Sequence, residues 1–170
     1  MAQVNYTDNG LVYITKSTFS SVTSVSIDNC FSADYSQYKI IYDLTDSVGD
    51  NNTNVYLRAG GVNETGSTYT RQYVYAAATT IAAGRITTTY WNGFMQATPT
   101  NATIGILEIL NPYQSTYTTA WNVCKANSDP NIVLISNAFG STVTTSFDGF
   151  QASFPNNTSG TVYVYGYVES

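Results

Sequence analysis

Few side chains in this sequence could perform acid–base or nucleophilic chemistry. The chain has no histidine, which is the residue best suited to proton transfer near neutral pH and the commonest metal ligand. Its absence excludes the Ser-His-Asp and Cys-His arrangements of nucleophilic enzymes. The sequence also contains no glycine-rich phosphate-binding loop and no G-x-S-x-G motif. Carboxylate pairs remain, because they hydrolyse glycosides without histidine.

Glu108 is the acidic residue that stands inside a strongly apolar segment, 104–110. One interpretation makes it the general acid of a glycan-degrading enzyme. The other places it on the solvent side or at an interface, because Ile104, Ile106 and Glu108 alternate with Leu107 and Ile109 along a strand. We favour the second interpretation and predict no catalytic residue.

Three further carboxylates, Asp43, Asp46 and Asp50, cluster around one polar segment. Carboxylate oxygens are suitable ligands for calcium, but their spacing does not match an EF-hand loop. We therefore expect a solvated loop, and neither a metal site nor any other cofactor. Asp28 and Asp34 are interpreted as turn and cap residues.

Aromatic side chains offer a different chemistry, stacking on sugar rings. Tyr90 and Trp91 are adjacent, and Tyr163, Tyr165 and Tyr167 alternate, which places these three on one face of a strand. Tyrosine and tryptophan are also enriched in cores and at subunit interfaces. We favour the core or interface role over glycan binding.

The two cysteines, Cys30 and Cys124, belong to no C-x-x-C pair. A disulfide framework needs more cysteines in a shorter chain. We expect two buried thiols, although the sequence alone leaves a bridge between them open.

Composition indicates a β-protein with an unusual surface. Charged residues make up 10% of the 170 residues, against about 25% in ordinary soluble domains. The net charge is −5 and there are 15 tyrosines. Nucleic-acid binding is not expected, since that requires clustered basic residues, and the basic residues here are dispersed: Lys16, Lys39, Arg58, Arg71, Arg85 and Lys125. No secretory signal or membrane-spanning stretch is predicted.

Period-two alternation in many short runs predicts antiparallel strands. The predicted strands are 11–16, 22–28, 38–44, 54–59, 69–77, 85–91, 104–110, 117–124, 142–147, 149–154 and 161–168. Asp148-Gly149 predicts a hairpin turn, Asn111-Pro112 ends the 104–110 strand, and residues 155–157 precede the last strand. Segment 32–37 forms at most one helical turn.

These elements predict an all-β fold, an antiparallel β-sandwich with about ten strands and almost no helix. A jelly roll is the commonest such arrangement at this size. We expect residues 1–10 to form a short N-terminal arm and residues 11–170 a single domain.

Three segments resemble small virion proteins of tailed bacteriophages, especially marine and cyanobacterial ones. The first, 18–44, contains IDNCF and YSQY; the second, 55–69, contains LRAGG; the third, 159–168, is SGTVYVYGYV. The resemblance implies a β-sandwich or jelly roll on the particle exterior, often as a trimer, without catalysis. It transfers no functional residue to this chain.

The expected function is therefore that of a non-enzymatic virion surface protein, which decorates or cements a capsid. The expected partners are copies of the chain in a homotrimer and the major capsid protein, and no nucleic acid or membrane. Two alternatives remain. One is a small tail-fibre adhesin that binds a host-surface glycan, and the weaker one is a glycan-degrading enzyme that depends on Glu108.

Overall fold

The computed structural model describes residues 10–46, 51–97, 103–128 and 131–168. These residues form eleven β-strands and no helix, so none of them provides a helix able to cross a membrane. The strands are β1 (Leu11–Ile27), β2 (Gln37–Asp46), β3 (Asn51–Ala59), β4 (Val62–Asn63), β5 (Tyr69–Ala77), β6 (Thr80–Thr88), β7 (Trp91–Ala97), β8 (Thr103–Leu110), β9 (Thr118–Ser128), β10 (Asn131–Ser141) and β11 (Gly149–Tyr167).

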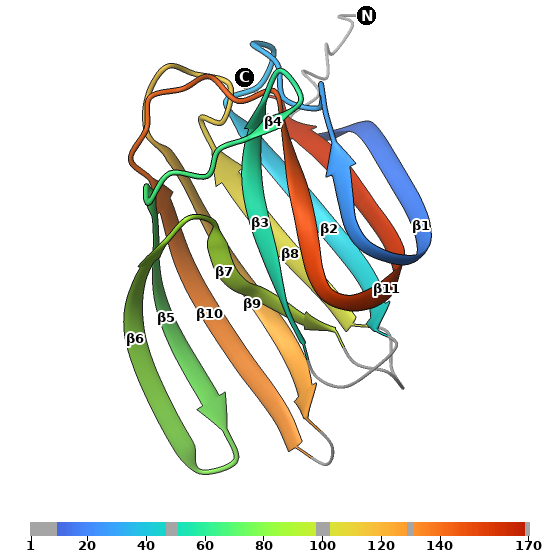
Figure 1. Ribbon diagram of the computed structural model, residues 1–170, viewed down its shortest axis with the longest axis vertical. Helices are drawn as coiled ribbons and strands as arrows, with labels where there is room; N and C mark the ends of the chain where they lie inside the picture. The colour runs from blue at the N-terminus through green and yellow to red at the C-terminus, as the bar shows by residue number, and fades with distance from the viewer. Residues whose placement is uncertain (1–9, 47–50, 98–102, 129–130, 169–170) are drawn as a thin grey trace, which may run out of the picture.

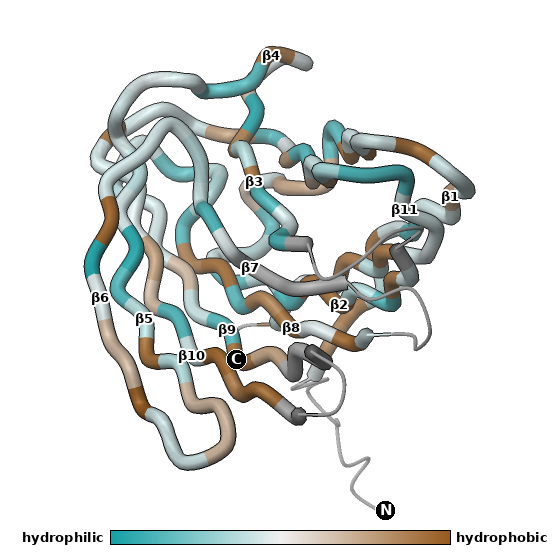
Figure 2. Tube along the Cα trace, turned by 60° about the horizontal axis from the view of Figure 1, so that its bottom comes forward, coloured by the Kyte–Doolittle hydropathy of each residue, from teal (hydrophilic) through white to brown (hydrophobic). Residues whose placement is uncertain are grey.

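All the strand pairs are antiparallel, and together they form one curled sheet (Figures 1 and 2). The long strand β11 belongs to both halves of the curl. Its residues 149–153 pair with β3, its residues 158–166 pair with β2, and β1 follows it along both parts. We call the two halves the small limb (β3, β4 and β7 beside β11) and the large limb (β2, β8, β9, β10, β5 and β6 beside β11).

The core lies between the two limbs. Along β2, the alternate residues Tyr38, Ile40, Tyr42 and Leu44 are completely buried, as expected for a strand with one face toward the core. The small limb contributes an opposing set of buried side chains, which includes Val55, Leu57, Trp91 and Phe150. Aromatic rings bridge the limbs: Phe150 lies 6.3 Å from Tyr42, and Trp91 lies 5.5 Å from Phe139, between ring centroids.

The predicted all-β antiparallel fold is confirmed, and the curled sheet is consistent with a sandwich of the jelly-roll type. Two pairs of predicted strands are each one strand in the structure. The predicted strands 11–16 and 22–28 both lie on β1, except that residue 28 follows its last residue. The predicted strands 149–154 and 161–168 both lie on β11, except that residue 168 follows its last residue. The register between β1 and β11 shifts between Phe19 and Ser24. These shifts let the two strands bend together, so each continues as one strand.

Other predictions were wrong. Strand β10 was missed, although it lies between β9 and β5 in the large limb; Asn137 interrupts its apolar face and hides the alternation. Residues 142–147 are not a strand, because their backbone bonds to loops, as in the 2.8 Å bond from Phe147 N–H to the Pro112 carbonyl. The predicted 85–91 strand spans the end of β6 and the start of β7.

Asp148-Gly149 is also not a hairpin turn. The carbonyl of Asp148 accepts hydrogen bonds from the N–H groups of Cys30 (2.8 Å) and Phe31 (3.0 Å), and β11 begins at Gly149. This residue pair therefore ties the segment after β1 to the start of β11. The turn predicted at 32–37 is present, and Asn111-Pro112 does end β8.

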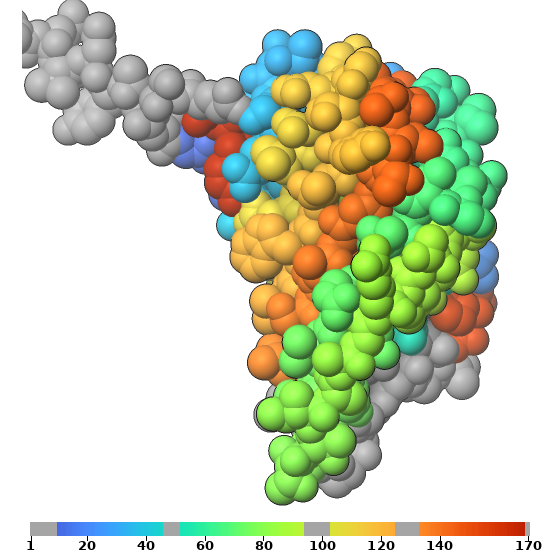
Figure 3. Space-filling view, turned by 90° about the vertical axis from the view of Figure 1, so that its left-hand side faces the viewer, coloured from blue at the N-terminus to red at the C-terminus, as the bar shows by residue number. Residues whose placement is uncertain are grey.

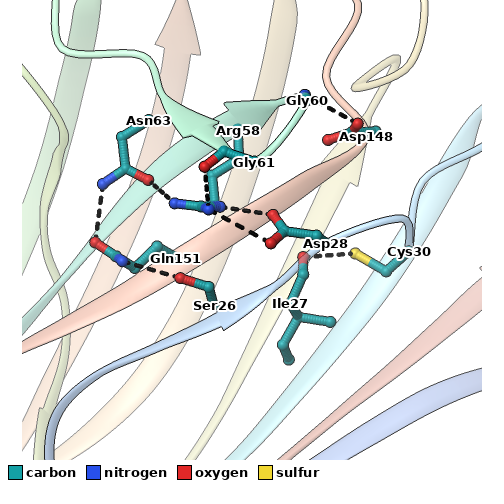
Figure 4. A network of polar contacts seen from close by, with 10 residues as sticks. All are labelled: Ser26, Ile27, Asp28, Cys30, Arg58, Gly60, Gly61, Asn63, Asp148 and Gln151. Carbon is teal, nitrogen blue, oxygen red and sulfur yellow. Dashed lines mark hydrogen bonds and ion pairs between the residues drawn. The ribbon is translucent and has the colours of Figure 1, made fainter.

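Around this junction, a polar network connects β1, β3, β4 and β11 (Figure 4). The guanidinium of Arg58 contacts the Asp28 carboxylate at 2.6 Å and also donates to Asn63 and to the Gly61 carbonyl. Asn63 donates to Gln151 at 2.9 Å. Asp28 was interpreted only as a turn residue, but it is the ion-pair partner of Arg58. We call this network the Arg58 clamp.

The clamp joins two of the sequence segments quoted above. IDNCF contains Asp28, LRAGG contains Arg58, and the two meet in this ion pair. Because the side chain of Arg58 is mostly buried and that of Asp28 is about a third exposed, we expect the pair to stabilise the fold more than a fully exposed pair does.

We predict that Asp28→Asn and Arg58→Met each destabilise the chain and that their effects are not additive. A double-mutant cycle by urea unfolding should give a coupling of about 1 kcal/mol. Arg85→Met, at an exposed residue of β6, is the control and should change the unfolding free energy by less than about 0.5 kcal/mol. Strictly additive effects of the two clamp substitutions would contradict this role.

Candidate functional site

The exposed side of the large limb carries large apolar side chains on several neighbouring strands, and we call it the outer face. The register places Ile106 opposite Val123 across β8 and β9. The large apolar residues exposed on its central and edge strands are Ile104, Ile106, Leu110, Trp121, Val123, Leu134, Val74 and Ile81. Among them Trp121 is 53% exposed and Ile104 62%. Large apolar side chains that are exposed together on neighbouring strands are typical of an interaction site.

The outer face is also poor in charge. On β8, β9, β10 and β5, its described side chains include one charged group, Glu108, and the flanking strands add Lys39 and Asp43 of β2 and Arg85 of β6. Glu108 is bonded to Lys39 of the neighbouring β2, with 3.2 Å between the Lys39 Nζ and the Glu108 Oε1, and Tyr167 donates a hydrogen bond to the same oxygen at 2.9 Å. One oxygen of the Glu108 carboxylate is thus bound to two groups of the same chain.

The structure confirms that Glu108 shares a face with Ile104 and Ile106, but this carboxylate is not open to solvent. It is only 5% exposed, and its Oε2 has no hydrogen-bond partner in the described part of the chain. Glu108 therefore lies on the expected side of its strand but is covered, because Lys39 and Tyr167 reach across the sheet to it. The contacts of Glu108 are a lysine and a tyrosine, and no second carboxylate contacts it among the described residues.

The three carboxylates considered for calcium are only partly described. Asp43 is exposed on the outer face of β2, Asp46 is the last residue of β2, and Asp50 and the side chain of Asp46 lie outside the described residues. Within the described part of the chain, no group of three potential metal ligands occurs. Asp34 lies in the predicted turn, where its carboxylate accepts a hydrogen bond from Ser32 at 3.0 Å.

The aromatic residues considered for sugar stacking fall into two classes. Trp91 is 1% exposed and donates to the Gly140 carbonyl at 3.0 Å, so it is a core residue and cannot stack on a ligand. Tyr163, Tyr165 and Tyr167 alternate along β11 as predicted and are half-buried on the outer face. Tyr165 forms an edge-to-face contact with the exposed Tyr13 of β1, with 5.9 Å between ring centroids.

A second candidate site lies on the inner side of the large limb and was missed by the sequence analysis. Beside β5 and β6 a pocket opens that is lined by Arg71, Tyr73, Tyr75, Asn52, Ala82 and Ile135. We call it the arginine pocket. Figure 3 views the molecule from this edge, where β5 and β6 (green) form a narrow rim beside β9 and β10 (orange).

Arg71 is 8% exposed and is held by amide groups, not by a carboxylate. Its Nε donates to Asn137 Oδ1 at 2.7 Å, and its Nη1 donates to Asn92 Oδ1 at 3.3 Å. Asn137 in turn donates to Asn122 at 2.6 Å. Burial lowers the pKa of the Arg71 guanidinium from its ordinary value. The alternation of Tyr69, Arg71, Tyr73 and Tyr75 was visible in the sequence, but the asparagines come from other strands.

Comparison with protein-family models, with curated proteins and with solved structures found no match to this chain. The candidate sites therefore rest on their geometry alone: an apolar outer face suited to contact with another protein, and an inner pocket with a buried cation.

Both cysteines are buried and no disulfide joins them, as expected. Burial also raises the pKa of the Cys30 thiol, which therefore stays protonated at pH 8, and the thiolate is the reactive form. We predict that a thiol reagent labels the native chain at pH 8 at least about a hundredfold more slowly than the urea-unfolded chain. Counting the labelled thiols tests this: rapid native labelling, or fewer than two thiols after unfolding, would contradict it.

Proposed function

We propose that the chain is a non-enzymatic structural protein of the outer surface of a tailed-phage particle, where it decorates or cements the capsid. The observation that carries the proposal is the apolar, charge-poor outer face. The choice of a tailed-phage particle rests on the three segments that resemble phage virion proteins. In this proposal, the outer face is the surface by which the chain attaches to the major capsid protein.

The chemistry of the outer face supports attachment to a protein partner. A stable interface covers about 800 Å² on each partner, and its centre is typically apolar, aromatic and depleted in charge. Trp121, exposed in the middle of this face, is the residue type most enriched among those that dominate binding energy. Since Glu108 is already paired with Lys39, covering the face strips water from few unpaired ions.

We further propose that copies of the chain associate as a homotrimer. Strand β6 lies at one end of the strand order, and among the described strands its partner is β5. An exposed sheet edge offers unpaired backbone groups to a neighbouring chain, and closed rings of identical subunits are the usual way to cover such surfaces. Sedimentation of the purified chain distinguishes a trimer from the 18.5 kDa monomer.

The copy number of the chain in purified particles tests the proposal, and quantitative mass spectrometry measures it against the major capsid protein. We expect a copy number comparable to that of the capsid protein, or one trimer for every few capsomers. A much smaller number would contradict the decoration role and favour the tail. Complete absence from particles would overturn the virion proposal.

We also predict that Val123→Asp abolishes attachment to particles, because it places an unpaired carboxylate in the middle of the outer face. Val123 is 44% exposed, so the unfolding free energy should change by less than about 0.5 kcal/mol. The control is Thr144→Asp, which adds the same charge at an exposed residue of the segment between β10 and β11. If particles depleted of the chain bind both variants equally, the outer face is not the attachment surface.

The second candidate function is a small tail-fibre adhesin that binds a host-surface glycan. The half-exposed tyrosines of β11 and Tyr13 favour it, because aromatic rings at a sheet surface can stack on sugars. Under this alternative, Tyr13→Ala and Tyr165→Ala weaken binding of the chain to host cells, whereas Val123→Asp does not.

A further inference from the structure

The arginine pocket contains a buried positive charge that has no acidic partner in the described part of the chain. The two ion pairs among the described residues are Lys39–Glu108 and Arg58–Asp28, and neither involves Arg71. Buried charges are ordinarily paired, because transfer of an unpaired ion from water is costly. The two asparagines that contact Arg71 provide hydrogen bonds but no negative charge. An anion from outside the chain would complete this site.

Two amides hold the guanidinium in place, and one of its three nitrogens has no hydrogen bond to a described residue. Asn137 accepts a hydrogen bond from its Nε and Asn92 accepts one from its Nη1, and neither of these hydrogen bonds uses Nη2. One face of the guanidinium lies over the ring of Tyr73, with 4.3 Å from Cζ to the ring centroid. The terminal edge formed by Nη1 and Nη2 is the part of an arginine that binds a carboxylate through two parallel hydrogen bonds.

Two glycines make room for this arrangement. Gly93 of β7 has φ +65, and a Cβ there would collide with the guanidinium of Arg71. Gly84 stands opposite Tyr73 in the register of β5 and β6, and a Cβ there would lie 2.6 Å from the tyrosine hydroxyl. The side chains of Arg71 and Tyr73 can take these positions only because both neighbours lack a Cβ.

The remaining walls suit a sugar ring. Tyr73 and Tyr75 offer aromatic surface, Ala82 and Ile135 offer apolar surface, and the exposed Asn52 offers an amide that can donate to or accept from a hydroxyl. A few convergent polar groups in a mainly apolar cleft are the usual composition of a small-molecule site. We propose that the arginine pocket binds a sugar acid, whose carboxylate pairs with Arg71 and whose ring packs on Tyr73 and Tyr75.

The planar fork of arginine matches the paired oxygens of a carboxylate or a phosphate, and the aromatic and apolar walls of the pocket add a preference for an anion that also carries a ring. Uronic acid residues of surface glycans have this combination of a ring and a carboxylate. The pocket is separate from the outer face, since its residues are on the inner side of the large limb. A chain attached to a particle through the outer face would keep this pocket available.

Titration of the full-length chain by NMR with glucuronate, glucose and inorganic phosphate tests the proposal. We expect glucuronate to shift the resonances of Tyr73 and Tyr75 and to bind at least about tenfold more tightly than glucose or phosphate. Equal binding of glucose would overturn the role of the carboxylate. Equal binding of phosphate would overturn the assignment of a sugar acid, and no binding of glucuronate would overturn the site.

Variants locate the site. Asn52→Asp places a negative charge at the rim of the pocket and should weaken glucuronate binding about tenfold. Because Asn52 is exposed, this variant should fold normally. Asn157→Asp makes the same change at an exposed residue of β11 outside the pocket and should bind as the original chain does. Equal binding by the two variants would place the ligand elsewhere.

Arg71→Lys keeps the charge but removes the fork, and should also weaken binding at least about tenfold. If this variant does not fold, the Asn52→Asp and Asn157→Asp comparison decides the question. These measurements use the isolated chain, whereas the proposed function is tested by copy number in particles. A failure of glucuronate binding would therefore leave the proposed function standing, and a failure of the proposed function would leave the glucuronate site standing.

Discussion

The structure depends on the hydrogen bonding of β11, which serves two different parts of the sheet in turn. Its first residues pair with β3 and its last residues with β2, while β1 follows it on the other side. Neither β2 nor β3 pairs with β11 between Ser153 and Thr158. Pro155 lies in this interval and has no N–H to donate. The sheet changes direction in this interval, and Pro155 leaves it with one backbone donor fewer to satisfy.

The bend brings the two limbs face to face, and their unequal size determines what is exposed. The small limb covers the inner side of β2, β8 and β9, where the core residues are fully buried. It does not extend over the ends of β5 and β6, which form a rim at one edge of the curl (Figure 1). The arginine pocket opens there, next to the start of β7. No described strand covers the other side of the large limb, so the apolar side chains of its outer face are exposed.

Polar residues have an unusual part in this core. Asn122, Asn137 and Arg71 lie on three neighbouring strands and are joined by hydrogen bonds in a row across the sheet. Buried amides are costly unless they are satisfied. Once they are satisfied, they favour a single register, because a slip of one residue would move every one of them to the outer face. The row therefore fixes the register of β9, β10 and β5 and also presents the guanidinium to the pocket.

Local pattern in the sequence determined the all-β class, most strand positions and the faces of β2, β5 and β8, since alternation depends only on neighbouring residues. It could not show that β1 and β11 run through their irregular segments, or that β10 exists despite Asn137. The ion pair of Asp28 with Arg58, the burial of Glu108 and the arginine pocket were decided by the tertiary structure. In each case the contacting side chains come from strands far apart in the chain, and only the pairing of those strands brings them together.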